Sequence, residues 1–496
     1  MKNYHLRPMK IREHLGLLFA LGLFIFLFLH HNWGRMDGID AHIFTAMGFH
    51  VAEGQQLYVD VWESKPINIY ILNALAFKIF GVQYSSIWLI QLINGFFACF
   101  LVYRLTSFWT KDKHLALISS LFFMWLFYFS GLYYSGNCTE EFGVTFLLAG
   151  IFFMVKSWAV PSRSKLLLSG AMLSMAFWFK EPFLFSMLPW LTWHFIQLIR
   201  KRSWKWIAFS LLGLAIPFVL YLGYFLLSGS IDEVFKIFIY NQEYTAFMGL
   251  EFSEKISKGW EYLITYLQYR FTIVPYLVLL IVPALVLARR QKQISSILIL
   301  LLCQALLEIL SISLSGLTVT HYYLQILPTL VLIIMVSLHA ILNRLSFRPR
   351  LIVKGVLIGL ILNAIFNIEL KDSPRLDRYD EIKAYFDANK SEEDRLFVEN
   401  AWHGALYVIN KMKSDATIPT PLFHYFMIQD KYNHERVEKF VRSLRSKPPR
   451  YIVVSKERGI LKNHTELNSW FYMIYQKGKS FKAGNDVLTI YELSLP

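Results

Sequence analysis

The sequence predicts a polytopic α-helical membrane protein with a small α/β domain at its C-terminal end. Of its 496 residues, 55% are hydrophobic and 17% are aromatic, and the mean hydropathy of +0.40 is too high for a soluble globule. Apolar runs of bilayer-spanning length recur up to about residue 368. Beyond about residue 370 the sequence becomes charged and mixed. These observations define the fold class.

Eleven apolar runs are candidates for transmembrane helices. They cover residues 15–31, 85–107, 114–130, 141–158, 166–179, 183–198, 206–228, 271–288, 293–314, 322–342 and 351–368. The run from Pro66 to Gly81 is also apolar, but as a helix it would reach only about 22 Å, short of the ~30 Å hydrocarbon core. We therefore expect it to be an interfacial helix within the first outward connector.

The basic residues support this choice and orient the chain. Without a span at Pro66–Gly81, the basic connectors all fall on one side, which the positive-inside rule makes cytoplasmic. The N-terminus is then cytoplasmic, and the acidic connectors at 32–65, 131–141 and 229–270 face outward. Because connector lysines and arginines account for the formal charge of +15, we expect no nucleic-acid partner.

We place the domain boundary after residue 368. Residues 1–368 form the transmembrane domain, and residues 369–496 form an extracytoplasmic α/β domain of ordinary size. In the second domain the patterns predict helices at 377–389 and 401–411, and strands at 395–399, 451–454 and 487–493.

Acidic residues gather in two of the outward connectors. The first connector contains Asp37, Asp40, Asp60, Glu63 and Lys65. Asp40 begins a predicted helix, Ala41–Ala52, that ends at Gly54, so ordinary helix capping is its alternative role. The second connector carries Glu140 and Glu141 directly before a span, where capping is again the alternative. Together the two connectors indicate one acidic site on the outward side.

Cationic and aromatic side chains accompany these acids. Lys180 lies at the outer end of a span among aromatic residues, and its alternatives are a pair with Glu181 or snorkelling to the interface. His321 and Tyr322 open a later span from the outward side, where an aromatic belt is the ordinary interpretation. Lys65, before Pro66, has a similar ambiguity.

These groups suit transfer of a sugar from a polyprenyl phosphate. A carboxylate can deprotonate the acceptor hydroxyl, while lysine and histidine stabilise the departing lipid phosphate. One base suffices, because a phosphate leaves without being protonated, whereas a glycosidase needs two carboxyl groups. The alternative class is a transporter or flippase of lipid-linked sugars, which would favour internal repeats, broken helices and acids buried in mid-span.

The order of these motifs resembles the GT-C superfamily of integral-membrane glycosyltransferases, especially the bacterial branch akin to protein O-mannosyltransferases and lipid A aminoarabinose transferases. The resemblance rests on Asp40 to Gly54, Tyr58-Val-Asp60, Lys65-Pro66 to Gly81, Asn137 to Glu141 and His321 to Pro328. In the tail it rests on Trp402 to Tyr407, Pro421 to Tyr425 and Pro449 to Val454. It therefore covers nearly the whole chain.

The resemblance implies an inverting transferase whose catalytic part is the transmembrane domain. It would act at the outer face of a bacterial inner membrane, with a periplasmic C-terminal domain. The donor would be a polyprenyl-phosphate sugar and the acceptor an envelope glycolipid, polysaccharide or protein, among membrane lipids.

The resemblance also implies roles for individual residues. The catalytic candidates are Asp40, Glu140, Glu141 and Asp37, and the substrate-binding candidates are Lys65, Asp60, Lys180, His321 and Tyr322. No cofactor is certain. A divalent metal stays open, and neither connector contains a compact Asp-x-Asp pair.

Overall fold

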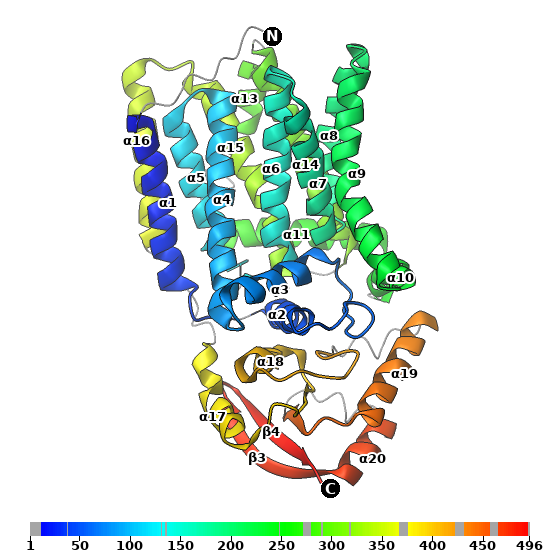
Figure 1. The fold of residues 1–496 in the computed structure, drawn as a ribbon. Helices are drawn as coiled ribbons and strands as arrows, with labels where there is room; N and C mark the ends of the chain where they lie inside the picture. Colours follow the sequence, from blue (N-terminus) through cyan, green and yellow to red (C-terminus); the bar gives the residue numbers. More distant parts are fainter. Residues whose placement is uncertain are drawn as a thin grey trace.

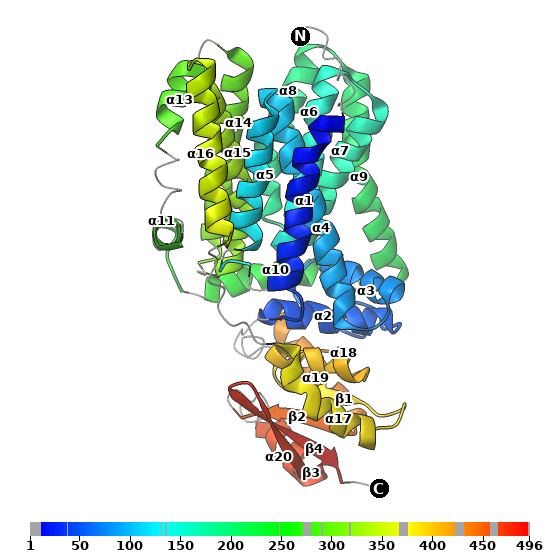
Figure 2. The same cartoon turned by 90° about the vertical axis from the view of Figure 1, so that its left-hand side faces the viewer.

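The protein consists of a helical bundle and a smaller α/β domain, which lies beyond the end of the bundle remote from the N-terminus (Figures 1 and 2). The computed structural model describes residues 11–36, 38–129, 131–133, 136–247, 249–270, 279–288, 291–316, 319–366, 375–421, 431–456 and 465–494. The predicted fold class, a polytopic helical membrane protein with a C-terminal α/β domain, is confirmed.

The bundle helices coincide with the predicted apolar runs. They are α1 (Ile11–His31), α4 (Tyr84–Thr110), α5 (Lys113–Tyr128), α6 (Thr139–Ala159), α7 (Arg163–Phe179), α8 (Phe183–Arg200), α9 (Trp204–Leu227), α13 (Ile281–Ala288), α14 (Lys292–Leu314), α15 (Leu327–Leu342) and α16 (Phe347–Phe366). Among the described residues, five helical segments are long and apolar enough to cross a membrane: α4, α6, α9, α14 and Thr320–Leu342. Part of the predicted span 271–288 lies outside the described residues.

Two helices of the first outward connector lie across the end of the bundle, between it and the α/β domain (Figure 1). They are α2 (Ile39–Ala52) and α3 (Asn68–Phe80). The predicted interfacial helix corresponds to α3, which at 13 residues is about 20 Å long and too short to span. The connector at 229–270 also forms helices, α10 (Ile231–Phe247) and α11 (Phe252–Arg270).

The α/β domain is built around a small mixed sheet. Its strands are β1 (Leu396–Val398), β2 (Tyr451–Ser455), β3 (Tyr475–Ala483) and β4 (Asp486–Leu493), in the order β1-β2-β4-β3. Strand β1 is parallel to β2, and the other pairs are antiparallel. Its helical elements are η2 (Leu376–Tyr379), α17 (Asp380–Asn389), η3 (Ala401–His403), α18 (Ala405–Asn410), α19 (Lys431–Ser446) and α20 (Thr465–Ile474). The expected boundary at residue 368 lies outside the described residues.

The predicted helix at 401–411 is divided at Gly404, where the α/β domain meets α2. A Cβ at Gly404 would lie only 2.8 Å from the backbone oxygen of His42, so the close contact requires glycine. Nearby, the backbone N–H of Trp62 donates to the oxygen of Thr417 over 2.7 Å. The α/β domain is therefore fastened to the same connector that carries Asp40.

Candidate active site

Asp40 lies in the first turn of α2, close to His321, which comes much later in the sequence. Its Oδ2 atom is 3.2 Å from Nε2 of His321, an ion-pair distance. His321 belongs to η1 (Thr320–Gln325), the segment that leads into α15. Both side chains are largely buried, with 21% of Asp40 and 14% of His321 exposed. The first outward connector therefore contacts the segment that leads into α15.

The environment keeps Asp40 ionised. Burial alone would raise the pKa of its carboxyl, but His321, and then the positive charges of Lys65 and Lys180, hold that pKa well below its usual range. Asp40 is therefore a carboxylate at neutral pH. A carboxylate in this form is available to accept a proton from a hydroxyl group.

Glu140, at the start of α6, forms a buried ion pair with Lys180 at the end of α7. The other carboxylate oxygen of Glu140 accepts a hydrogen bond of 2.9 Å from the Thr139 hydroxyl. The Lys180 ammonium also lies over the Tyr322 ring, 3.2 Å from its centroid. Lys180 is only 8% exposed. The alternatives of snorkelling and a pair with Glu181 do not describe this position, because the charge points into the protein toward Glu140.

Lys65 follows the turn that leads into α3, and its backbone is held at two points. Its N–H donates to Glu63 over 2.9 Å, and its carbonyl accepts from the Tyr58 hydroxyl over 2.7 Å. Burial disfavours the ammonium, but electrostatic interactions with Tyr322, Glu63 and Asp40 outweigh burial and raise the pKa of Lys65. Within the described part of the chain, the Lys65 ammonium has no hydrogen bond or ion pair. The Lys65 ammonium is therefore a cation that could bind an anionic ligand.

Glu141 is next to Glu140 but faces a different set of neighbours. Its Oε1 accepts a hydrogen bond of 2.7 Å from Tyr133, and its Oε2 accepts from the Asn137 N–H over 2.8 Å and from Gln91 over 3.2 Å. These donors come from α4 and from the connector before α6. Glu141 therefore holds this connector against the bundle, on a side of α6 that differs from the Lys180 side.

Two other candidate residues are not part of the cluster that the structure describes. Asp60 is exposed, and its Oδ2 accepts the backbone N–H of Gln56 over 2.8 Å within a turn. Asp37 lies outside the described residues. The predicted substrate-binding set is thus divided, with Lys65, Lys180, His321 and Tyr322 near Asp40 and with Asp60 in a surface turn.

Two buried polar residues are absent from the predicted set. Gln325, in η1, donates to the Ser186 hydroxyl over 2.8 Å and to the Pro182 carbonyl over 3.2 Å. It thereby ties the segment that carries His321 to the turn after Lys180. Glu308, in α14, is fully buried and accepts from Gln304 over 2.8 Å. The available signal for Glu308 was a single acid within an apolar run.

No metal centre is formed by the described residues, among which no group of three or more His, Cys, Asp or Glu side chains could hold a metal ion. The charges that meet here are two carboxylates, two ammonium groups and one imidazole. They come from the connector before α3, from α2, from the ends of α6 and α7, and from η1. Such a cluster can bind an anion through the lysines and accept a proton at Asp40.

Comparison with known proteins finds one matching family model and solved structures of similar fold. A family model described as dolichyl-phosphate-mannose-protein mannosyltransferase matches residues 64–226. The fold is similar to that of ArnT from Cupriavidus metallidurans bound to undecaprenyl phosphate, with a TM-score of 0.62 and 13% identity over 96% of this chain and 97% of that one. For the same protein in the apo state the TM-score is 0.62 with 12% identity, over 96% and 98% of the two chains. A sequence search of curated proteins found no match.

The family match over residues 64–226 and the shared fold agree with the resemblance to the GT-C superfamily that the sequence motifs indicated. The family match includes Lys65, Glu140 and Lys180. Asp40 and His321 lie outside the matched segment, so their part in the site rests on the geometry described above.

Proposed function

We propose that this protein is an inverting glycosyltransferase that moves a sugar from a polyprenyl-phosphate donor to an acceptor hydroxyl in the cell envelope. The observation that carries this proposal is the convergence of Asp40, His321 and the Glu140–Lys180 pair at one end of the bundle. The similarity to a solved protein bound to undecaprenyl phosphate supports a lipid-phosphate donor. The family description, which names a lipid-phosphate sugar, points the same way.

In this proposal Asp40 is the base. It accepts the proton of the acceptor hydroxyl while the hydroxyl oxygen bonds to the anomeric carbon of the sugar. The bond from that carbon to the phosphate oxygen breaks on the opposite face, so the configuration inverts. Lys65 and Lys180 stabilise the departing phosphate dianion, and His321 orients the Asp40 carboxylate. The phosphate leaves without a proton, so no second acid is needed.

We further propose that the α/β domain and the site face the periplasm across a bacterial inner membrane. The described connectors and adjoining helix ends at the other end of the bundle contain Lys111, Lys165, Lys201, Arg344 and other cations, as expected for the cytoplasmic side. Reporter fusions after Lys113 and after the C-terminal domain test this orientation. A cytoplasmic α/β domain would contradict it.

One observation favours the alternative of a lipid-linked sugar transporter, namely the buried carboxyl of Glu308 inside α14. Its neighbours are neutral, however. Gln304 donates to Glu308 over 2.8 Å and to Thr329 over 2.9 Å, and it accepts from the Trp190 indole over 2.6 Å. The neutral amide introduced by Glu308→Gln keeps most of this network, so we expect transfer within about two-fold of the native rate. A proton-coupled transporter would lose its function in this variant.

A transfer assay with the purified protein tests the proposed function. The protein is incubated in lipid nanodiscs with a panel of polyprenyl-phosphate sugars and with an extract of envelope acceptors, and products are identified by mass spectrometry. We expect a new glycosidic bond and an equal amount of free polyprenyl phosphate. A transporter would instead move the intact donor across a vesicle membrane, with no new bond. The Asp60→Asn variant should form the same product, because it changes an exposed acid of the same connector that carries Asp40.

A further inference from the structure

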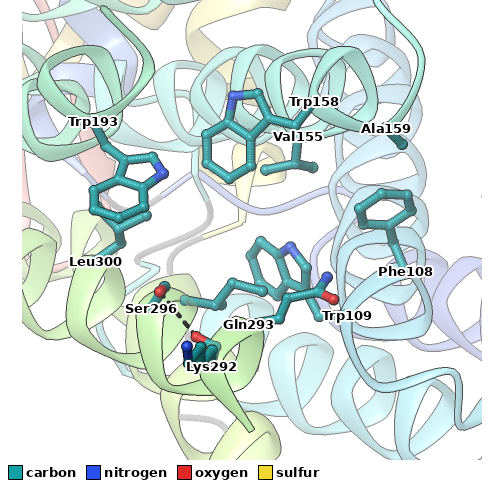
Figure 3. Close-up of a pocket in the computed structure, with 11 residues that line it drawn as sticks. Phe108, Trp109, Val155, Trp158, Ala159, Trp193, Lys292, Gln293, Ser296 and Leu300 are labelled. Atoms are coloured by element: carbon teal, nitrogen blue, oxygen red, sulfur yellow. Dashed lines mark hydrogen bonds between the residues drawn. The ribbon is translucent and has the colours of Figure 1, made fainter. Parts of the chain in front are cut away.

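A cavity of about 280 Å³ lies at the end of the bundle opposite the acidic cluster. It is lined by residues of α4, α6, α8 and α14, among them Trp109, Trp158, Trp193 and Lys292 (Figure 3). Trp158 is 18 positions after Glu140 on α6, which corresponds to about 27 Å along the helix. This cavity is therefore a separate site, at the depth of the other membrane surface.

The walls of this cavity are fixed by their own contacts. The rings of Trp109 and Trp158 both stack on Trp190, with centroids 5.9 Å and 6.2 Å away. The Trp158 indole also donates to His194 over 3.0 Å, and the other His194 nitrogen lies 3.0 Å from the Ser210 hydroxyl. These indoles cannot rotate inward without losing these contacts. The space is therefore already formed and would be costly to close.

The charge at this end of the bundle is positive. Lys292 is exposed at the cavity, and within the described residues its ammonium has no hydrogen bond or ion pair. In the described connectors of this end, the single carboxylate is Asp112, which is already paired with Lys354. An apolar cavity walled by indoles and bordered by an unpaired cation is complementary to an amphiphile that has an anionic head and an aliphatic chain.

We infer that this cavity binds one anionic glycerophospholipid from the membrane leaflet opposite the acidic cluster. Its phosphate contacts Lys292, and part of one acyl chain lies between Trp158 and Trp193. The volume accommodates one chain segment and excludes a protein element such as a helix. This inference does not depend on the proposed sugar transfer, because the two sites lie at opposite ends of α6.

Native mass spectrometry of the detergent-solubilised protein tests the inference, with phosphatidylglycerol and phosphatidylcholine as probes. We expect one phosphatidylglycerol to be retained per chain, with about five-fold weaker binding after Lys292→Gln. Lys201→Gln is the matched control, since it removes an exposed cation from the same end without altering the cavity, and it should bind as the native protein does. Equal retention of both lipids, or unchanged binding in Lys292→Gln, would overturn the inference.

A second variant tests the place of the acyl chain. Ala159 lines the cavity, so Ala159→Phe fills the space without removing an indole. We expect this variant to lose the retained lipid while its size-exclusion profile stays native. Undiminished lipid retention in a folded Ala159→Phe protein would place the lipid elsewhere. If Ala159→Phe does not fold, Trp193→Leu removes one of the two indoles between which the acyl chain lies, and the same two outcomes apply.

Discussion

Two adjacent glutamates at the start of α6 serve two different surroundings. Glu140 forms an ion pair with the Lys180 ammonium, and its other oxygen accepts from the Thr139 hydroxyl. Glu141 faces Tyr133, Gln91 and the Asn137 N–H, which are all neutral donors. One residue of helix rotation, about 100°, separates the carboxylate with a charged partner from the carboxylate with neutral donors.

The two sides of α6 differ in whether a ligand could enter without breaking existing hydrogen bonds. On the Glu141 side the carboxylate is saturated by three neutral donors, and a ligand would have to break one of them to enter. On the Glu140 side the ammonium groups of Lys180 and Lys65 can accept a phosphate and redistribute their contacts. A carboxylate held by neutral donors is therefore a framework group, while one among cations belongs to a site for anionic ligands.

The largest expected effect is that of Asp40→Asn. An amide cannot accept the hydroxyl proton, so we expect the transfer rate to fall about 10²–10⁴-fold. Membrane insertion and the thermal transition should stay near native, because Asn keeps the size of the side chain. The measurement is the turnover of donor by the purified protein, with Asp60→Asn as control. Native turnover in Asp40→Asn would remove Asp40 from the mechanism.

The paired variants Glu140→Gln and Glu141→Gln test the comparison directly. Glu140→Gln leaves Lys180 buried without its counter-charge, and we expect transfer to fall about 30-fold or more. Glu141→Gln removes an acceptor from neutral donors, so we expect a loss of about 1–3 kcal/mol in stability. Its rate per folded molecule should stay within about two-fold. Turnover and thermal unfolding are measured on both variants, and the opposite pattern would reverse the two assignments.

Lys65→Met tests the cation that faces the cluster without a direct partner. Removal of one charge-assisted contact to phosphate, worth about 1.5 kcal/mol, should raise the KM for the lipid donor roughly ten-fold. The kcat should change less. Lys78→Met, on the exposed face of α3, is the control and should leave both constants unchanged. An unchanged donor KM in Lys65→Met would show that Lys65 does not bind the phosphate, and the role would then fall to Lys180 alone.

Hydropathy and helix length predicted most of the bundle, because every span must satisfy its own backbone hydrogen bonds in lipid. Length separated α3 from the spans, and the distribution of basic residues agreed with this choice. The helices α10 and α11 escaped prediction because their sequences are amphipathic, and an outward connector gave no reason to expect them. Strand β3 was also missed, since its exposed positions carry lysines, as in Lys477, Lys479 and Lys482.

The residue types of the site could be predicted from the sequence. The directions in which their side chains point could not. Asp40, Lys180 and His321 could be named because a charge beside an apolar run is unusual. The choice between Glu140 and Glu141 needed the rotation of α6 against its neighbours, which no sequence pattern fixes. The same applies to Asp60, whose exposed turn is a matter of local chain path.

The smallest expected effect concerns the C-terminal end of α2, where His50 packs on the α/β domain. Burial, opposed by a hydrogen bond to Gln55 and aided by the charge of Lys413, lowers the pKa of His50 to about 4. Between pH 6.5 and 4 the unfolded chain therefore binds a proton that the folded chain does not, so stability falls as the pH falls. At pH 5.5 this costs about 1.4 kcal/mol.

His50→Gln should remove this pH dependence. Its thermal transition, followed by tryptophan fluorescence, should fall less between about pH 7 and pH 5.5 than that of the native protein. His434→Gln changes an exposed histidine of the α/β domain and should behave as native. Because His50 contacts the Tyr407 ring at 4.8 Å and lies at the opposite end of α2 from Asp40, sugar transfer by folded His50→Gln should be unchanged. A loss of transfer without a loss of stability would mean that the C-terminal end of α2 also affects the site at Asp40.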